Sequence, residues 1–168
     1  MIADRTARWL PAIGGLALTM LLSTAFVAPR LIWNASASAP IGLYLRIDAV
    51  PRSGDFALIR TPDAVRALAA RRGYLPGNVP MVKQIAAWSG DTICARGDEI
   101  LINGKIAATR LAADSAHRPL PAWSGCQHLT RDQFFPLMRN VRASFDGRYF
   151  GPVARTSILG RLVPLWTK

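Results

Sequence analysis

The chain has 168 residues, a length that suggests one domain of ordinary size plus a short appendage. Charged residues make up 18% of it, apolar residues 51%, and the formal net charge is +11. The arginines are scattered along the whole chain and no basic motif is interleaved with aromatic residues, so we do not expect nucleic acid as a partner. Membrane lipid is a better fit, because basic residues beside a bilayer attract anionic headgroups by about 1 kcal/mol each.

The first predicted element is a single transmembrane helix at residues 9–29. This run, WLPAIGGLALTMLLSTAFVAP, carries no charge, and about 20 apolar helical residues cross a hydrocarbon core. A removed signal peptide has a shorter apolar core of about 7–15 residues, and Trp9 stands at one edge of the run as interfacial anchors do. We therefore favour a retained anchor, with a removed signal peptide and a buried helix of a soluble domain as the alternatives.

Charge and cysteine content together predict the orientation of this anchor. Arg5 and Arg8 favour a cytoplasmic amino terminus, although arginines also follow the run. Cys94 and Cys126 are the two cysteines, too few for a zinc site and without CxxC spacing. In an exported domain we expect them to form a disulfide, the alternative being two unpaired buried thiols. The expected organisation is a cytoplasmic tail at 1–8, the anchor at 9–29 and a periplasmic domain at 30–168.

The remainder of the chain predicts a mainly β domain. Runs with strand-like alternation or apolar character, bounded by turn residues, fall at eight places. They are residues 42–47, 55–60, 81–88, 92–95, 99–102, 105–108, 143–153 and 157–166. Asn103-Gly104, between two of these runs, is a strong signal for a tight hairpin.

One short surface helix is predicted at residues 62–72, PDAVRALAARR. Pro62 suits its first turn and Gly73 follows its end. Further along, we expect an irregular segment at 109–129, rich in proline, and a helical turn at 130–137.

A catalytic serine is one interpretation of the stretch 34-NASASAPIGLYLR-46, which follows the anchor; a plain linker is the other. A serine hydroxyl needs an adjacent base to become a nucleophile, and histidine is the usual one. His117 and His128 both lie in the irregular segment without strong sequence context. We expect them to be exposed or locally bonded loop residues rather than members of a Ser-His-Asp triad.

A neutral lysine can replace histidine as the base, provided that burial lowers its pKa. A decrease from about 10.4 to about 7–8 requires roughly 4 kcal/mol from the environment. Lys105 lies in the predicted hairpin turn and Lys168 is the last residue, whereas Lys83 is embedded in the apolar run 81–88. Taken alone, even Lys83 would be expected to bury its stem and keep its ammonium group in water.

Three motifs, with a hairpin between the second and the third, change that expectation. SASAPIG follows the anchor, then comes MVKQIAAWSGD, then an ING hairpin and SFDGRYFGPV. This order resembles the membrane-bound Ser–Lys signal peptidases, and among them the TraF-type peptidases of conjugative transfer. The resemblance covers nearly the whole chain and implies a signal-peptidase-like β domain behind one N-terminal transmembrane helix. We expect neither a cofactor nor a metal.

The resemblance also implies roles for individual residues. Ser38 would be the nucleophile and Lys83 the general base. Ser36 would contribute its hydroxyl to an oxyanion hole beside the backbone N–H of Ser38, where charge develops in the transition state. Ser144 would orient the lysine amine.

Supporting residues follow from the same resemblance. Asp146 and Arg148 would pair near the site and hold its geometry, while Gly90 and Asp91 would shape the turn after the lysine strand. Three of the positions at which the chain departs from general signal peptidases lie directly beside these residues. Ala39 follows the nucleophile where methionine is usual, Gln84 follows the lysine where arginine is frequent, and Gly147 stands where serine is usual.

The predicted function is that of a membrane-anchored serine endopeptidase of the bacterial inner membrane, with its catalytic domain in the periplasm. Its expected partners are a prepilin or another membrane-inserted precursor, bound as an added β-strand, and other proteins of a conjugation apparatus. Water or the pilin's own amino group would resolve the acyl-enzyme. A general type I signal peptidase and a non-catalytic assembly component remain as alternatives.

Overall fold

The computed structural model describes residues 29–168, so the anchor expected at 9–29 lies outside the described residues except for its last one. Within 29–168, no helix is long and apolar enough to cross a membrane. Strands dominate this part of the chain, beside one helix of nine residues and one of four. The mainly β class is therefore confirmed for the described domain, while the anchor stays a prediction.

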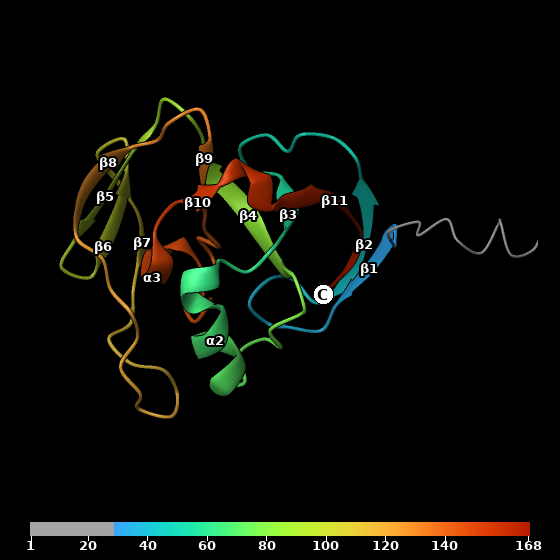
Figure 1. The fold of residues 1–168 in the computed structure, drawn as a ribbon, viewed down its shortest axis with the longest axis horizontal. Coiled ribbons are helices and arrows are strands. Elements are labelled where there is room, and N and C mark those ends of the chain that lie inside the picture. The colour runs from blue at the N-terminus through green and yellow to red at the C-terminus, as the bar shows by residue number, and fades with distance from the viewer. Residues whose placement is uncertain (1–28) are drawn as a thin grey trace, which may run out of the picture.

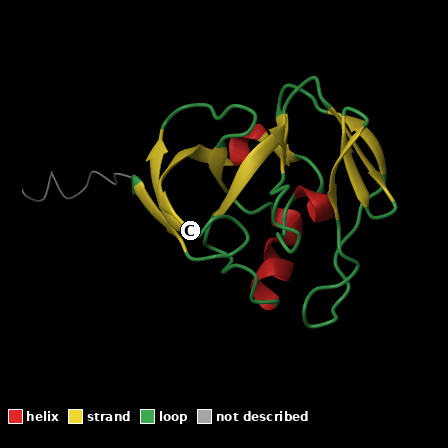
Figure 2. Ribbon diagram, turned by 180° about the vertical axis from the view of Figure 1, so that it is seen from behind, coloured by secondary structure: helices red, strands yellow, loops and turns green. Residues whose placement is uncertain are grey.

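The larger of two sheets has seven strands in the order β1-β2-β11-β3-β4-β9-β10, and every neighbouring pair is antiparallel. Its strands are β1 (Leu31–Asn34), β2 (Gly42–Ile47), β3 (Phe56–Ile59), β4 (Met81–Ala87), β9 (Gln133–Pro136), β10 (Val153–Ala154) and β11 (Ile158–Thr167). The sheet is strongly curved, with β1 and β2 at one end of it (Figure 1; Figure 2). Nearly every residue of β4 is buried, as its apolar sequence predicts for a central strand.

The smaller sheet has four strands and forms a separate lobe, on the left in Figure 1. Its order is β7-β6-β5-β8, with β5 (Thr92–Arg96), β6 (Glu99–Ile102), β7 (Lys105–Thr109) and β8 (Gly125–His128). Ile93 and Ile100 of this sheet pack in one core cluster with Ala87 and Phe135 of the larger one. This shared core fixes the lobe against the lysine strand.

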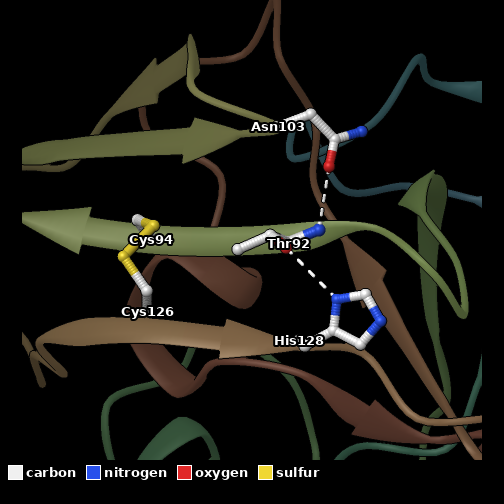
Figure 3. The surroundings of a disulfide bond; sticks show 5 residues. All are labelled: Thr92, Cys94, Asn103, Cys126 and His128. Carbon is white, nitrogen blue, oxygen red and sulfur yellow. Dashed lines mark hydrogen bonds between the residues drawn. A yellow bond between two sulfur atoms is a disulfide. The ribbon is translucent and has the colours of Figure 1, made fainter.

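A disulfide joins Cys94 of β5 to Cys126 of β8, as the sequence predicts (Figure 3). The two residues are directly opposite in the strand register, with Cα atoms 4.0 Å apart. Because it crosses between strands 32 residues apart in sequence, the bond closes the loop that carries His117, while His128 lies two residues beyond Cys126.

The helices are α2 (Asp63–Arg71), α3 (Gly147–Phe150) and the 3₁₀ turn η1 (Arg155–Ser157). The surface helix predicted at 62–72 is confirmed by α2. Val65 and Ala69, one helical turn apart, face the core, whereas most of its other side chains are exposed or half-buried. Asp63 in the first turn and Arg71 in the last complement the helix dipole.

Two local predictions were wrong. Residues 130–137 contain the strand β9 rather than a helical turn, because Phe134 and Phe135 point to opposite faces and both are fully buried. Residues 143–153 were expected to be extended, but Asp146 caps the short helix α3 by accepting a hydrogen bond from the Arg148 N–H. Only Val153 of this segment lies in a strand, as the first residue of β10.

Two strands were not predicted at all. β1 ends at Asn34, the first residue of the stretch that could have been a linker, and β8 lies in the segment expected to be irregular. Each is only four residues long and is held by pairing to one neighbour, β2 and β5 respectively. Such pairing is a tertiary effect that a four-residue pattern does not reveal.

Gly42 marks the point where the serine-containing stretch enters β2. Its φ is +153°, and a Cβ there would collide with the backbone carbonyl oxygen of Trp166 in β11. Glycine therefore allows β2 and β11 to approach closely directly after the serines.

Candidate active site

The serine loop, residues 35–41, connects β1 to β2 and carries Ser36 and Ser38, both half-buried. The two hydroxyl groups hydrogen-bond to each other at 2.9 Å, and the Ser38 N–H donates to the Ser36 hydroxyl at 3.2 Å. The structure thus brings the predicted nucleophile and the predicted oxyanion donor into direct contact.

Lys83, on the central strand β4, reaches this loop from the larger sheet. Its side chain is 1% exposed, and its Nζ donates to the Ser144 hydroxyl at 2.8 Å and to the Ser38 backbone carbonyl at 3.4 Å. Ser144 is itself fully buried, so a hydroxyl oriented by the protein faces the amine. The three residues predicted to form the centre of the site are therefore adjacent.

Burial lowers the pKa of Lys83 from 10.5 to about 8. The charged amine loses hydration in the protein interior, and this desolvation is the largest cause; the Asp146 carboxylate opposes it, and the Arg148 guanidinium lowers the pKa further. An appreciable fraction of Lys83 is therefore neutral near pH 8, as a general base requires.

Asp146 and Arg148 form a buried ion pair, 2.8 Å from Oδ1 to Nε. Asp146 also accepts the Met138 N–H at 3.0 Å, while Arg148 donates to the carbonyl oxygens of Met138 (2.7 Å) and Arg142 (3.0 Å). These bonds tie together both ends of the segment that contains Ser144. The predicted pair thus lies beside the site and holds its backbone.

Aromatic packing fixes the same segment from the other side. Phe145, between Ser144 and Asp146, stacks on Tyr149 at a centroid distance of 5.6 Å and contacts Tyr74 at 5.1 Å. No sequence motif pointed to this contact, because Tyr74 lies in the loop after α2, far along the chain from Phe145.

The remaining predicted residues serve structural purposes. Asp91 accepts the Trp88 N–H at 2.8 Å and the Asn103 side-chain amide at 2.7 Å, and Gly90 has a φ of +93°, so both shape the turn after β4. His128 hydrogen-bonds to Thr92 at 3.2 Å in the smaller sheet (Figure 3), and His117 is exposed. Neither histidine bonds to Ser36 or Ser38, and the structure gives no support to a Ser-His-Asp triad.

Asn34 is the residue of the site that sequence reasoning missed. It ends β1, is 7% exposed, and its side chain bonds to the backbone of the serine loop. The only signal in the sequence was a polar residue at the end of an apolar run, which is also typical of a turn.

One contact needed for proton transfer differs from the expected arrangement. Among the hydrogen bonds of residues 29–168, none joins the Ser38 hydroxyl to the Lys83 amine, because that hydroxyl bonds to Ser36. The group of Ser38 that contacts the amine is instead its backbone carbonyl, at 3.4 Å. Catalytic hydrogen bonds are often loose without substrate.

The chain belongs to the signal peptidase family, peptidase S26, whose pattern it matches over residues 6–166. This confirms the family that the three sequence motifs suggested.

The chain is also similar in sequence to several individual proteins. A plasmid transfer protein TraF from Escherichia coli is 32% identical over 93% of both chains, and a conjugal transfer protein TraF from Agrobacterium fabrum is 31% identical over 80% of this chain and 81% of its own. A signal peptidase I from Leptolyngbya laminosa is 27% identical over 67% of this chain and 51% of its own. Among solved structures, a signal peptidase I from Enterococcus faecalis aligns with 70% of this chain and 100% of its own, at 21% identity and a TM-score of 0.41.

Replacing Lys83 with methionine should stabilise the fold. Because the pKa of Lys83 is lower in the folded chain than in the unfolded one, a charged lysine destabilises the fold at pH 6, and this cost is relieved between pH 8 and pH 10.5. The decrease in the pKa of Lys83 corresponds to a destabilisation of about 3 kcal/mol, which the Lys83→Met substitution removes. Loss of the hydrogen bond to Ser144 offsets about 1 kcal/mol of this gain. We expect the free energy of unfolding in urea to rise by about 2 kcal/mol at pH 6, and by less at pH 10.

Lys105→Met is the matched control, because Lys105 is exposed on β7 and should change stability little. A Lys83→Met variant that is less stable than the wild type at pH 6 would contradict the proposed cost of burying this amine.

Proposed function

We propose that this chain is a serine endopeptidase in which Ser38 is the nucleophile and Lys83 the general base. The observation that carries the proposal is the buried Lys83 amine, with a pKa lowered to about 8, held between the Ser144 hydroxyl and the backbone of Ser38. Membership of the signal peptidase family supports the same chemistry.

In the proposed mechanism the Ser38 hydroxyl first turns from Ser36 to Lys83. Neutral Lys83 accepts the hydroxyl proton as the serine oxygen attacks the substrate carbonyl carbon. The oxyanion that forms accepts hydrogen bonds from the Ser36 hydroxyl and the Ser38 N–H, two groups that lie within 3.2 Å of each other in the free enzyme. Protonated Lys83 then gives its proton to the leaving amine, and an acyl-enzyme on Ser38 remains.

Maturation of a prepilin is the substrate reaction that we propose. Two relatives that this chain matches over at least 80% of its length are named as plasmid or conjugal transfer proteins. A precursor strand would bind beside the serine loop, and water or the pilin's own amino group would resolve the acyl-enzyme. Other proteins of a conjugation apparatus would be partners in this setting.

A general type I signal peptidase is the second candidate, and the relative named signal peptidase I favours it. The chemistry would be identical and the range of substrates broader. A non-catalytic assembly component is less consistent with the site, because a scaffold gains nothing from the cost of burying Lys83.

The proposed location is the bacterial inner membrane, with the described domain in the periplasm. The Cys94–Cys126 disulfide suits an oxidising compartment. Trp33 and Trp166, each more than half exposed, stack at 5.9 Å on β1 and β11, and Trp33 stands four residues after the end of the expected anchor in the sequence. Exposed tryptophans of this kind favour the lipid headgroup region.

Processing in cells tests the catalytic assignment. Ser38→Ala removes the nucleophile and Lys83→Ala the base, so each should reduce cleavage of a co-expressed prepilin by at least about 10³-fold. Immunoblotting of precursor and mature pilin measures the result, with Ser89→Ala and Lys105→Ala as exposed controls that should process normally. Normal processing by either the Ser38 or the Lys83 variant would refute the assignment. Cleavage of a panel of precursors with other signal sequences separates the two candidate substrate classes.

Activity should fall as the pH decreases through the Lys83 pKa. A protonated lysine cannot accept the serine proton, so kcat should decrease about tenfold per pH unit below about 8 and level off above it. The measurement is cleavage of a precursor peptide by detergent-solubilised enzyme between pH 5 and pH 10. A rate that stays constant down to pH 5 is the result that a lysine base could not produce.

A further inference from the structure

Asn34 is a buried polar residue to which the proposed chemistry assigns no task. It is the last residue of β1 and stands directly before the serine loop, with 7% of its surface exposed. Burial of an amide costs free energy unless its polar atoms find partners, so its bonds show what the residue does in this fold.

The Asn34 side chain is hydrogen-bonded throughout to the backbone of the serine loop. Nδ2 donates to the carbonyl oxygens of Ser36 (2.9 Å), Ala39 (3.2 Å) and Pro40 (2.9 Å), so its two N–H groups are shared among three acceptors. Oδ1 accepts the N–H of Ser36 at 3.2 Å. The loop therefore wraps around this one amide.

These bonds hold the backbone of Ser36 and so determine the direction of its side chain. Both polar groups of the Ser36 backbone bond to Asn34, which leaves the Ser36 side chain free to meet Ser38. The Ser36 hydroxyl accordingly bonds to the N–H and to the hydroxyl of Ser38.

The same bonds orient the peptide groups around the nucleophile. The carbonyl groups of Ser36, Ala39 and Pro40 turn inward to Asn34, whereas the carbonyl of Ser38 turns to the Lys83 amine at 3.4 Å. The backbone of Ser38 thus faces the base, while Asn34 holds the carbonyl groups of Ser36 and Ala39.

We propose that Asn34 is a positioning residue for the nucleophile: its side-chain amide holds the serine loop in the shape that places Ser38 against Lys83 and Ser36 against the Ser38 N–H. This inference rests on the proposed function. Asn34 acts through the two serines, and a displacement of about 1 Å at a reacting group can cost about 100-fold in rate.

Tyr44 offers a matched control within the same loop. Its hydroxyl donates to the Pro40 carbonyl at 2.7 Å, an acceptor that it shares with Asn34, and it makes no hydrogen bond to Ser36 or Ser38. Tyr44→Phe therefore removes a bond to the loop but leaves both serines held by Asn34.

The test compares Asn34→Asp, Asn34→Ser, Asn34→Ala, Tyr44→Phe and the wild type as full-length proteins in detergent. The probe is the p-nitrophenyl ester of acetyl-Ala-Gly-Ala, whose acyl group transfers to a serine and releases p-nitrophenolate. Rapid mixing at a fixed pH above 8 gives the limiting acylation rate and the half-saturating concentration, and mass spectrometry of digested protein locates the adduct. Thermal unfolding reports whether each variant is folded.

Asn34→Asp keeps the shape of the side chain but replaces the donor group with an oxygen that repels three carbonyl oxygens. We expect its limiting acylation rate to fall about 100-fold with a half-saturating concentration within about threefold of the wild type. Asn34→Ser, which keeps one donor, should be faster than Asn34→Ala, and Tyr44→Phe should remain within about threefold of the wild type.

The outcomes separate this inference from the proposed function. If the wild type is not acylated on Ser38, the proposed function itself is wrong. Suppose instead that the wild type is acylated on Ser38, and that the Asn34→Asp and Asn34→Ala variants are folded and react at the wild-type rate. The proposed function then stands, and the positioning role is refuted. If Asn34→Asp does not fold, the acylation rates of Asn34→Ser and Asn34→Ala are compared instead. Equal rates for these two variants would refute the positioning role.

Discussion

Burial of the Lys83 amine, which forms no ion pair with a carboxylate of residues 29–168, is the constraint on which the rest of the domain depends. An ammonium group removed from water destabilises the fold, and the protein reduces that cost by lowering the pKa to about 8. The amine is shielded from water because it lies on the buried central strand β4 and beside the fully buried Ser144. The fold thus maintains a group that a more stable sequence would replace with an apolar side chain.

The site is assembled from three segments that are far apart in the sequence and held by different forces. Strand pairing within the larger sheet positions Lys83. The Asp146–Arg148 ion pair and aromatic stacking hold the segment of Ser144. The amide of Asn34 holds the serine loop. Because each support is separate, a substitution in one should leave the other two in place.

Much of this arrangement could be predicted from the sequence, and the failures have physical causes. The periodic runs gave β2 through β7, α2 and β11, and the order of three motifs identified the residues around Lys83. The strands β1 and β8 were missed because four residues paired to a single neighbour show no periodic pattern. The cap at Asp146 and the network of Asn34 depend on side chains meeting backbone atoms in three dimensions, which spacing along a chain does not reveal.

The most direct test of this account is the titration of Lys83 itself. With ¹³C-labelled lysine, the Cε resonance of Lys83 can be followed by NMR across the pH range in Ser38→Ala protein, which lacks the proposed nucleophile. The resonance is assigned through its absence in Lys83→Met. We expect a midpoint of about 8, well below that of an exposed lysine. A midpoint above 10 would show that the amine keeps its hydration and would contradict the assignment of Lys83 as a base.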